Sequence, residues 1–280
     1  MNMQRRSTAT PKYLLLLSVI ALATLVSASP ALAQSLGTAQ NFAVLGGSTV
    51  NNTGSSVITG NVGVSPGTVV NGFPPGLIVA GSIQAGNAVA SQAQTDLAAV
   101  LGTTAGTACT LDLSGQDLGN GRTLTPGVYC FSTSAQLTGI LNLDFLGNPN
   151  SVFLFKIGST LTTASGSSVV IRNAGTTTCP PNVFFRVGSS ATIGTGTSFF
   201  GNILAVTSIT LNTGAGLTGR ALANTGAVTL DTSTVTPCSQ AVVIPPPPPR
   251  PPGEDIPLSP MLLLLMGAGL ATVALFTLRR

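Results

Sequence analysis

The side chains that could do chemistry in this chain are few, and their spacing does not favour catalysis. Residues 34–240 contain no histidine and no glutamate, which excludes a Ser-His-Asp triad. Hydrolysis of a glycosidic bond would need two carboxylates close together, whereas the aspartates here are scattered. The Gly-rich stretches lack the lysine of a phosphate-binding loop. We therefore predict that the chain is not an enzyme and needs no cofactor, and we expect its aspartates at strand ends and turns: Asp96, Asp112, Asp117, Asp144 and Asp231.

The four cysteines indicate an oxidising compartment. Cys109, Cys130, Cys179 and Cys238 all lie in residues 34–240, and paired cysteines are typical of exported chains. Three pairings are possible, of which we favour Cys109–Cys130 and Cys179–Cys238, each holding one end of the domain. Free buried thiols are the alternative. A metal site is less favoured because there is no CxxC spacing and no histidine.

The charge of this region is balanced. Its five aspartates are matched by five basic residues, so the net charge of residues 34–240 is near zero. The sequence pI of about 9.2 therefore arises from the two ends of the chain. Because there is neither a basic patch nor an aromatic platform, we expect no nucleic-acid partner. The basic residues are Arg122, Lys156, Arg172, Arg186 and Arg220.

Short threonine-rich runs recur beyond Thr123. Four of the five fit the pattern Thr-(Leu/Ile)-x-Thr, and a second apolar run precedes each of them. Strand-forming units that recur about every 20 residues are typical of a β-solenoid, because a single coil cannot bury its own apolar face. The runs are 136–139, 160–163, 192–195, 210–213 and 229–232, preceded by 128–131, 152–155, 183–186, 202–205 and 220–223.

The alternation of side chains along these strands predicts one buried row and one exposed row. Leu137, Leu161, Ile193, Leu211 and Leu230 are expected to stack as a single inward ladder. The flanking residues then point outward, and successive coils place them about 4.8 Å apart. The sequence thus predicts a regular, uncharged outer face, whose candidate residues are Thr160, Thr162, Thr192, Thr210, Asn212 and Thr229.

Residues 82–101 depart from this pattern. They are rich in alanine and glutamine, lack proline, and place Ile83, Ala90, Leu97 and Val100 roughly on one face. We predict a helix here, the one substantial helix of an otherwise β domain that spans residues 34–240.

The two ends of the chain predict export and anchoring. Residues 1–33 combine basic residues, a short apolar run and small residues at Ala31 and Ala33, which indicates a signal peptide rather than a membrane anchor. Residues 241–255 form a Pro-rich linker. Residues 256–280 are a predicted transmembrane helix with a basic tail, or a sorting segment that is removed after export. We therefore expect an exported domain at the cell surface.

Segments throughout the domain resemble one known family. The segments 41–50, 60–67, 72–76, 113–118, 124–129 and 200–205 are similar to marker sequences of the microbial ice-binding proteins, and the match covers nearly the whole domain. The resemblance implies a right-handed, discontinuous β-helix with an α-helix alongside. It also implies a flat face of short side chains that binds ice.

The resemblance adds candidate residues at the ends of the threonine-rich runs. Some family members repeat Thr-(Ala/Gly)-x-(Thr/Asn) on the ice-binding face. Here 163–166, 195–198 and 213–216 keep the first half of that repeat, while Gly or Ser replaces the second half. The segment 104–107 fits fully but follows the predicted helix. The added candidates are Thr163, Thr195, Thr197, Ser198, Thr213 and Thr232.

The predicted function is binding of the ice crystal surface by a monomeric domain. Threonine offers a methyl group that holds water loosely and a hydroxyl group that both donates and accepts hydrogen bonds. The alternative is an adhesive or structural cell-surface module that uses the same face without acting on ice.

Overall fold

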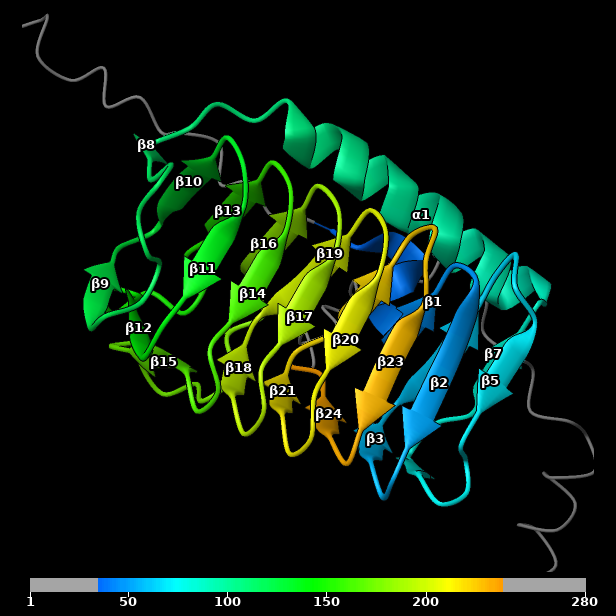
Figure 1. The fold of residues 1–280 in the computed structure, drawn as a ribbon. Helices are drawn as coiled ribbons and strands as arrows, with labels where there is room; N and C mark the ends of the chain where they lie inside the picture. The colour runs from blue at the N-terminus through cyan, green and yellow to red at the C-terminus, as the bar shows by residue number, and fades with distance from the viewer. Residues whose placement is uncertain (1–34, 239–280) are drawn as a thin grey trace, which may run out of the picture. The chain divides into compact units, whose positions relative to one another are not determined.

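The protein is a solenoid of three parallel β-sheets with one α-helix lying along its side (Figure 1). The computed structural model describes residues 35–238. Strand pairing is parallel in all three sheets. The prediction of a mainly β domain with a single substantial helix is confirmed for these residues.

The predicted ends of the chain lie outside the described residues. This applies to the signal peptide at 1–33, the linker at 241–255 and the transmembrane or sorting segment at 256–280. Between residues 35 and 238, no helix has the length and hydrophobicity needed to cross a bilayer.

The central strands of sheet A are buried on both faces, whereas its edge strands are largely exposed. The central strands therefore consist of nearly continuous apolar runs, as a parallel sheet covered on both sides requires. In spatial order the strands of sheet A are β7 (Ile83–Ala85), β4 (Asn61–Val64), β1 (Phe42–Gly46), β22 (Ala221–Ala223), β19 (Asn202–Ala205), β16 (Val183–Val187), β13 (Phe153–Ile157), β10 (Gly127–Phe131) and β8 (Leu111–Asp112).

Sheet B has one buried and one exposed face. Its strands alternate apolar and polar side chains, which is the pattern of a sheet that faces solvent on one side. In spatial order they are β11 (Ala135–Leu137), β14 (Leu161–Thr163), β17 (Ala191–Ile193), β20 (Ile209–Leu211), β23 (Val228–Asp231), β2 (Thr49–Thr53) and β5 (Val69–Asn71).

Sheet C closes the third side of each coil. Its inward side chains, among them Leu141, Leu217 and Val235, belong to the same core as those of sheets A and B. In spatial order its strands are β6 (Leu77–Val79), β3 (Val57–Thr59), β24 (Thr234–Thr236), β21 (Gly216–Thr218), β18 (Ser198–Phe200), β15 (Ser168–Arg172), β12 (Ile140–Asp144) and β9 (Arg122–Leu124).

The order of the coils in space differs from their order in sequence. The first coils, β1 to β7, form one end of the stack, and the chain then crosses to the other end, where it resumes at β8. Later coils return until β22, β23 and β24 pair with β1, β2 and β3. The solenoid is therefore discontinuous, as the resemblance implied; its handedness stays a prediction.

Helix α1 (Ala88–Ala105) supplies the crossing between the two ends (Figure 1). It starts later than the predicted 82–101, because residues 83–85 pair with β4 and the Asn87 side chain caps the helix by accepting a hydrogen bond from the Ala90 N–H at 3.0 Å. It also ends later, so that residues 104 and 105 are helical. Its apolar face, including Leu97, packs on the outer face of sheet A against Phe184 and Leu204.

Aromatic rings stack along the core at one end of the solenoid. The ring centroids of Tyr129 and Phe155 are 5.4 Å apart, those of Phe155 and Phe185 are 4.4 Å apart, and those of Phe185 and Phe199 are 4.7 Å apart. The parallel register brings the first three onto neighbouring strands at the same position. Stacked coils thus build a continuous column from side chains that no single coil could bury.

The inward ladder of sheet B differs from the prediction at one coil. Ile193, Leu211 and Leu230 stack as expected, but Leu161 pairs with Ala191 in the neighbouring ladder. Thr163 is the residue that pairs with Leu137. A shift of two residues keeps every side chain on its original face, so the alternation alone could not exclude it.

Both disulfides form as predicted, but one lies elsewhere than expected. Cys109–Cys130 joins the loop after α1 to β10 near one end of the stack. Cys179–Cys238 does not hold the other end, because the last coil is followed in space by the β1–β3 coil. It fastens the end of β24's coil to the loop before β16 in the middle of the solenoid.

Candidate functional site

The outer face of sheet B carries one continuous row of polar side chains. Each coil contributes the outward residue that follows an inward apolar position, and the parallel register aligns these residues across all seven strands. Strand spacing places neighbours about 4.8 Å apart, so the row is about 29 Å long. Figure 1 shows these strands side by side on one face, away from α1. In spatial order the row is Gln136, Thr162, Thr192, Thr210, Thr229, Asn51 and Asn71.

The four threonines of this central row are half-buried and keep their hydroxyl groups for solvent. Thr162, Thr192, Thr210 and Thr229 form no side-chain hydrogen bond with any residue in the described part of the chain. β-Branched side chains have restricted rotamers in a strand, so the hydroxyl groups are held in a regular array. The two asparagines extend the row, where Asn71 Nδ2 donates to Asn51 Oδ1 at 3.2 Å.

A second row lies on the side where the strands of sheet B begin. Backbone hydrogen bonds align Ser134, Thr160, Ser190 and Ser208 across successive coils. The Thr160 hydroxyl group donates to Ser134 Oγ at 2.8 Å. This row, like the central row, has no charged member, and together they form an uncharged surface two side chains wide.

The other side of the face ends in a turn toward sheet C. Asn212 and Asp231 follow the inward Leu211 and Leu230, and Thr195, Thr213 and Thr232 then lie exposed in the turn. Gly196 and Gly214 adopt φ of 65° and 72° there, a left-handed conformation that glycine takes without strain. Thr232 adopts φ 47° at the equivalent bend.

Three of the predicted contacts do not lie on this face. Thr163 and Thr197 are 4% and 1% exposed, and their hydroxyl oxygens lie 3.1 Å apart inside the corner between sheets B and C. They satisfy backbone groups, since Thr163 Oγ1 accepts from the Gly194 N–H and Thr197 Oγ1 donates to the Ala164 carbonyl. Ser198 is exposed but belongs to β18 in sheet C. The repeat at 163–166 and 195–198 therefore forms a corner rather than a binding strand.

The threonine-rich repeats did not indicate the contribution of the first coils. Asn51 and Asn71 fall in the central row because β2 and β5 extend sheet B beyond the last coil. The repeats begin beyond Thr123 and are defined by threonine, so they gave no sign of these asparagines. The signal that could have found them is an asparagine directly after two strand residues that end in valine, as in Thr49-Val50-Asn51 and Val69-Val70-Asn71.

Asp231 is the one charged residue on the strands of sheet B. Thr213 Oγ1 donates to its Oδ2, and Thr232 Oγ1 donates to its Oδ1 at 3.1 Å. The hydrogen bond from Thr213, followed by that from Thr232, holds the pKa of the Asp231 carboxyl below its usual range. The carboxylate is thereby tied to two neighbouring hydroxyl groups at the margin of the face.

Replacing Asp231 with Asn should make stability depend less on pH. Because the pKa is lowered by folding, the ionised carboxyl stabilises the fold above its unfolded pKa, and this contribution is lost as the pH falls through the folded pKa. We expect the wild type to melt slightly above Asp231→Asn at about pH 7 and together with it at about pH 2. Melting curves at both pH values test this, and an undiminished difference in acid would contradict it.

The site contains no grouping suited to metal chemistry. Within residues 35–238, no three side chains of the His, Cys, Asp and Glu types come together as metal ligands. The fold is thus a solenoid whose exposed face on sheet B carries a regular array of uncharged side chains.

The sequence comparisons name this class more closely. The model of the Ice-binding-like family matches residues 44–236, and the chain belongs to that family. An ice-binding protein of Nostoc sp. is 58% identical over 226 residues, which cover 80% of this chain and 82% of the relative.

Solved structures of ice-binding proteins match the fold of this chain. A crystal structure of an ice-binding protein from the Antarctic ascomycete Antarctomyces psychrotrophicus matches with a TM-score of 0.69 and 38% identity, over 74% of this chain and 98% of that one. An ice-binding protein from an Antarctic biological consortium matches with a TM-score of 0.69 and 42% identity, over 72% of this chain and 90% of that one.

Proposed function

We propose that this chain binds ice through the outer face of sheet B and catalyses no reaction. The observation that carries the proposal is the seven-membered central row, which is uncharged and regularly spaced. The contact residues are those of the central row, with Thr160 and Asn212 beside it and Thr195, Thr213 and Thr232 at its margin. Membership of the Ice-binding-like family supports the same function.

The proposed mechanism depends on weakly held, ordered water. A charged side chain keeps its own hydration shell, whereas a threonine methyl group releases water easily and its hydroxyl group can join a hydrogen-bonded lattice. Contacts of this kind are weak individually. They add up because the solenoid is already rigid, so little ordering entropy is lost on docking. Adsorbed molecules would make the ice front curve between them, which lowers the local freezing point.

Observation of a single ice crystal in a solution of the purified chain tests the function. Faceted growth or suppressed recrystallisation is the expected result, whereas round, unhindered growth would refute ice binding and leave an adhesive or structural role. Bovine serum albumin at the same concentration serves as the control for non-specific effects.

We further propose that the domain is exported and held at the cell surface. The supports are sequence features: the signal-like residues 1–33, the Pro-rich linker 241–255 and the apolar, charge-free stretch within 256–280. When the full chain is expressed in a bacterium, we expect it in the membrane fraction. A chain that stops before residue 256 should be released, and equal partition of the two chains would contradict the anchor.

A further inference from the structure

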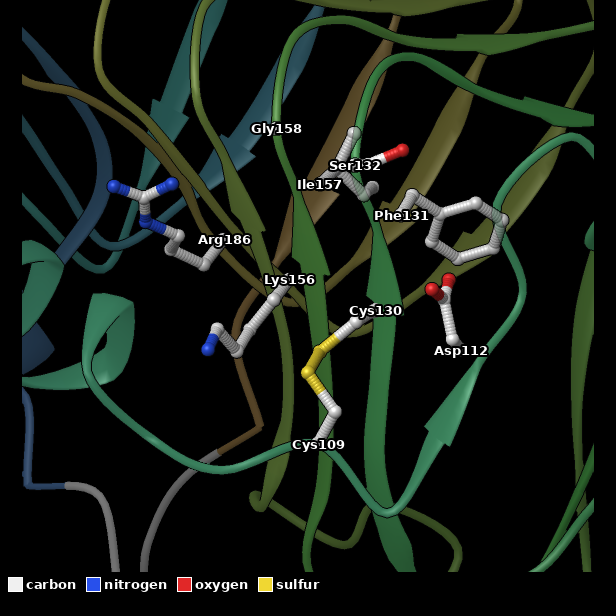
Figure 2. A pocket seen from close by; sticks show the side chains of 9 residues that line it. All are labelled: Cys109, Asp112, Cys130, Phe131, Ser132, Lys156, Ile157, Gly158 and Arg186. Carbon is white, nitrogen blue, oxygen red and sulfur yellow. A yellow bond between two sulfur atoms is a disulfide. The ribbon is translucent and has the colours of Figure 1, made fainter.

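A pocket with a largely apolar lining and two basic side chains lies on the outer face of sheet A, away from the proposed ice-binding face. Its volume is about 320 Å³, and Figure 2 shows the side chains that line it. Lys156 and Arg186 come from β13 and β16, while the Cys109–Cys130 disulfide forms one wall. Asp112 from β8 lies on the other side of the disulfide from these two cations (Figure 2).

The parallel register places the two cations next to each other. Cys130, Lys156 and Arg186 occupy one row across β10, β13 and β16. Lys156 and Arg186 therefore leave adjacent strands on the same face, about 4.8 Å apart at the backbone. Like charges at directly opposed positions on neighbouring strands destabilise a sheet unless something compensates them.

No carboxylate in the described part of the chain compensates this pair. The Arg186 side chain forms no hydrogen bond or ion pair with any residue from 35 to 238, and its Nε is buried without an acceptor. The Asp112 Oδ1 atom already accepts a hydrogen bond from the Ser114 N–H. The Nε–H of Arg186 has therefore lost its water without gaining a partner, while the side chain as a whole stays partly exposed.

Lys156 helps to hold the segment after α1, whereas Arg186 does not take part in this contact. The Lys156 ammonium group donates to the carbonyl of Thr107, just after the end of α1, where a cation also favours the helix dipole. It has two further N–H donors. Arg186 contacts neither that carbonyl nor any other acceptor among the described residues, so closing the helix end does not explain it.

We propose that this pocket binds an oxyanion between Lys156 and Arg186. The ligand class is a small group with planar or tetrahedral oxygens, such as phosphate or a carboxylate, either free or carried on a sugar as a uronate. The guanidinium group of Arg186 would donate hydrogen bonds to two of the ligand's oxygens, and the ammonium group of Lys156 would donate a third. The negative charge of the ligand would offset the repulsion between the two cations.

Calorimetric titration of the purified chain with inorganic phosphate and, separately, with glucuronate tests the site. Sodium chloride at matched ionic strength is the control for screening. We expect a dissociation constant of about 1 mM or lower for at least one of the two. Binding of phosphate indicates a free oxyanion, binding of glucuronate alone indicates a sugar acid, and binding of neither overturns the proposal.

Matched variants locate the binding. Arg186→Gln should weaken it by at least about tenfold, because a charge-assisted pair of hydrogen bonds is lost. Lys156→Gln provides an independent second variant if Arg186→Gln folds poorly. Arg172→Gln is the control, since Arg172 is an exposed arginine on sheet C. Binding that is unchanged in both pocket variants, or equally weakened in Arg172→Gln, overturns the assignment, and all three should still shape ice.

Discussion

Replacing Thr210 with tyrosine should abolish ice-crystal shaping while leaving the fold intact. Thr210 lies in the middle of the central row, with Thr192 and Thr229 on the neighbouring strands. A tyrosine ring there would rise above both threonines and hold a flat lattice away from several coils at once. We expect recrystallisation inhibition to fall by at least about tenfold, because many weak contacts are lost together.

The fold should tolerate this substitution. Tyrosine suits an exposed strand position, so the free energy of unfolding should change by no more than about 0.5 kcal/mol. Thr218→Tyr is the matched control, because Thr218 is an exposed strand threonine on sheet C. Equal loss of activity in both variants would show that the face is misassigned, and an unfolded Thr210→Tyr protein would require repetition at Thr192.

Replacement of a residue in the central row should reduce ice binding more than replacement of a residue in the turns beside it. Thr195 and Thr213, which the repeat pattern alone favours, lie in the turn beside sheet B rather than on its strands. The structure therefore moves the centre of the proposed site to Thr192 and Thr210. This shift follows from the register, which the sequence pattern did not resolve.

The sequence predicted the faces of the strands better than their partners. Thr162, Thr192, Thr210 and Thr229 point outward as expected, because the alternation of side chains depends only on local backbone geometry. The pairing of Leu161 with Ala191 was not predictable in that way, since a slip of two residues preserves both faces. The coil that contains Leu161 also contains the long segment 173–182, so the spacing of the runs along the sequence did not reveal the register.

The discontinuous order of the coils explains why Asn51 and Asn71 could not be predicted from the repeats. The chain places β2 beside β23, although the paired residues Asn52 and Leu230 are 178 positions apart in the sequence. A repeat search along the sequence has no access to such a contact. The resemblance to the family carried that information, whereas the strand pattern could not. The central row thus draws Asn51 and Asn71 from one part of the chain and its threonines from another.

The junction between the first and last coils depends on how the end of the last coil, near Cys238, is held. Arg220 is buried there, and its guanidinium group donates to the Gln40 and Cys238 carbonyls and to Asn202 Oδ1. Desolvation by burial lowers the pKa of Arg220 to about 10, so it remains charged at neutral pH. The end of the last coil is also fixed covalently by Cys179–Cys238.

Removal of this disulfide should destabilise the fold more than removal of the other. The Cys179–Cys238 link closes a loop with a sequence separation of 59, which corresponds to about 4 kcal/mol of chain entropy. Cys109–Cys130 has a separation of 21, which corresponds to about 3 kcal/mol. Urea unfolding of the two double serine variants measures both values.

The difference should exceed the entropic estimate, because the two links hold different parts of the solenoid. Loss of Cys109–Cys130 frees a terminal strand, whereas loss of Cys179–Cys238 loosens the end of the coil that pairs with β1, β2 and β3. We therefore expect Cys179→Ser/Cys238→Ser also to expose the coil of β22, β23 and β24 to proteolysis and to disturb the row where Thr229 meets Asn51. Wild-type stability in this variant would contradict the prediction. So would normal ice shaping after its last coil has been cleaved, because the last coil would then not be needed to join β2 and β5 to the rest of sheet B.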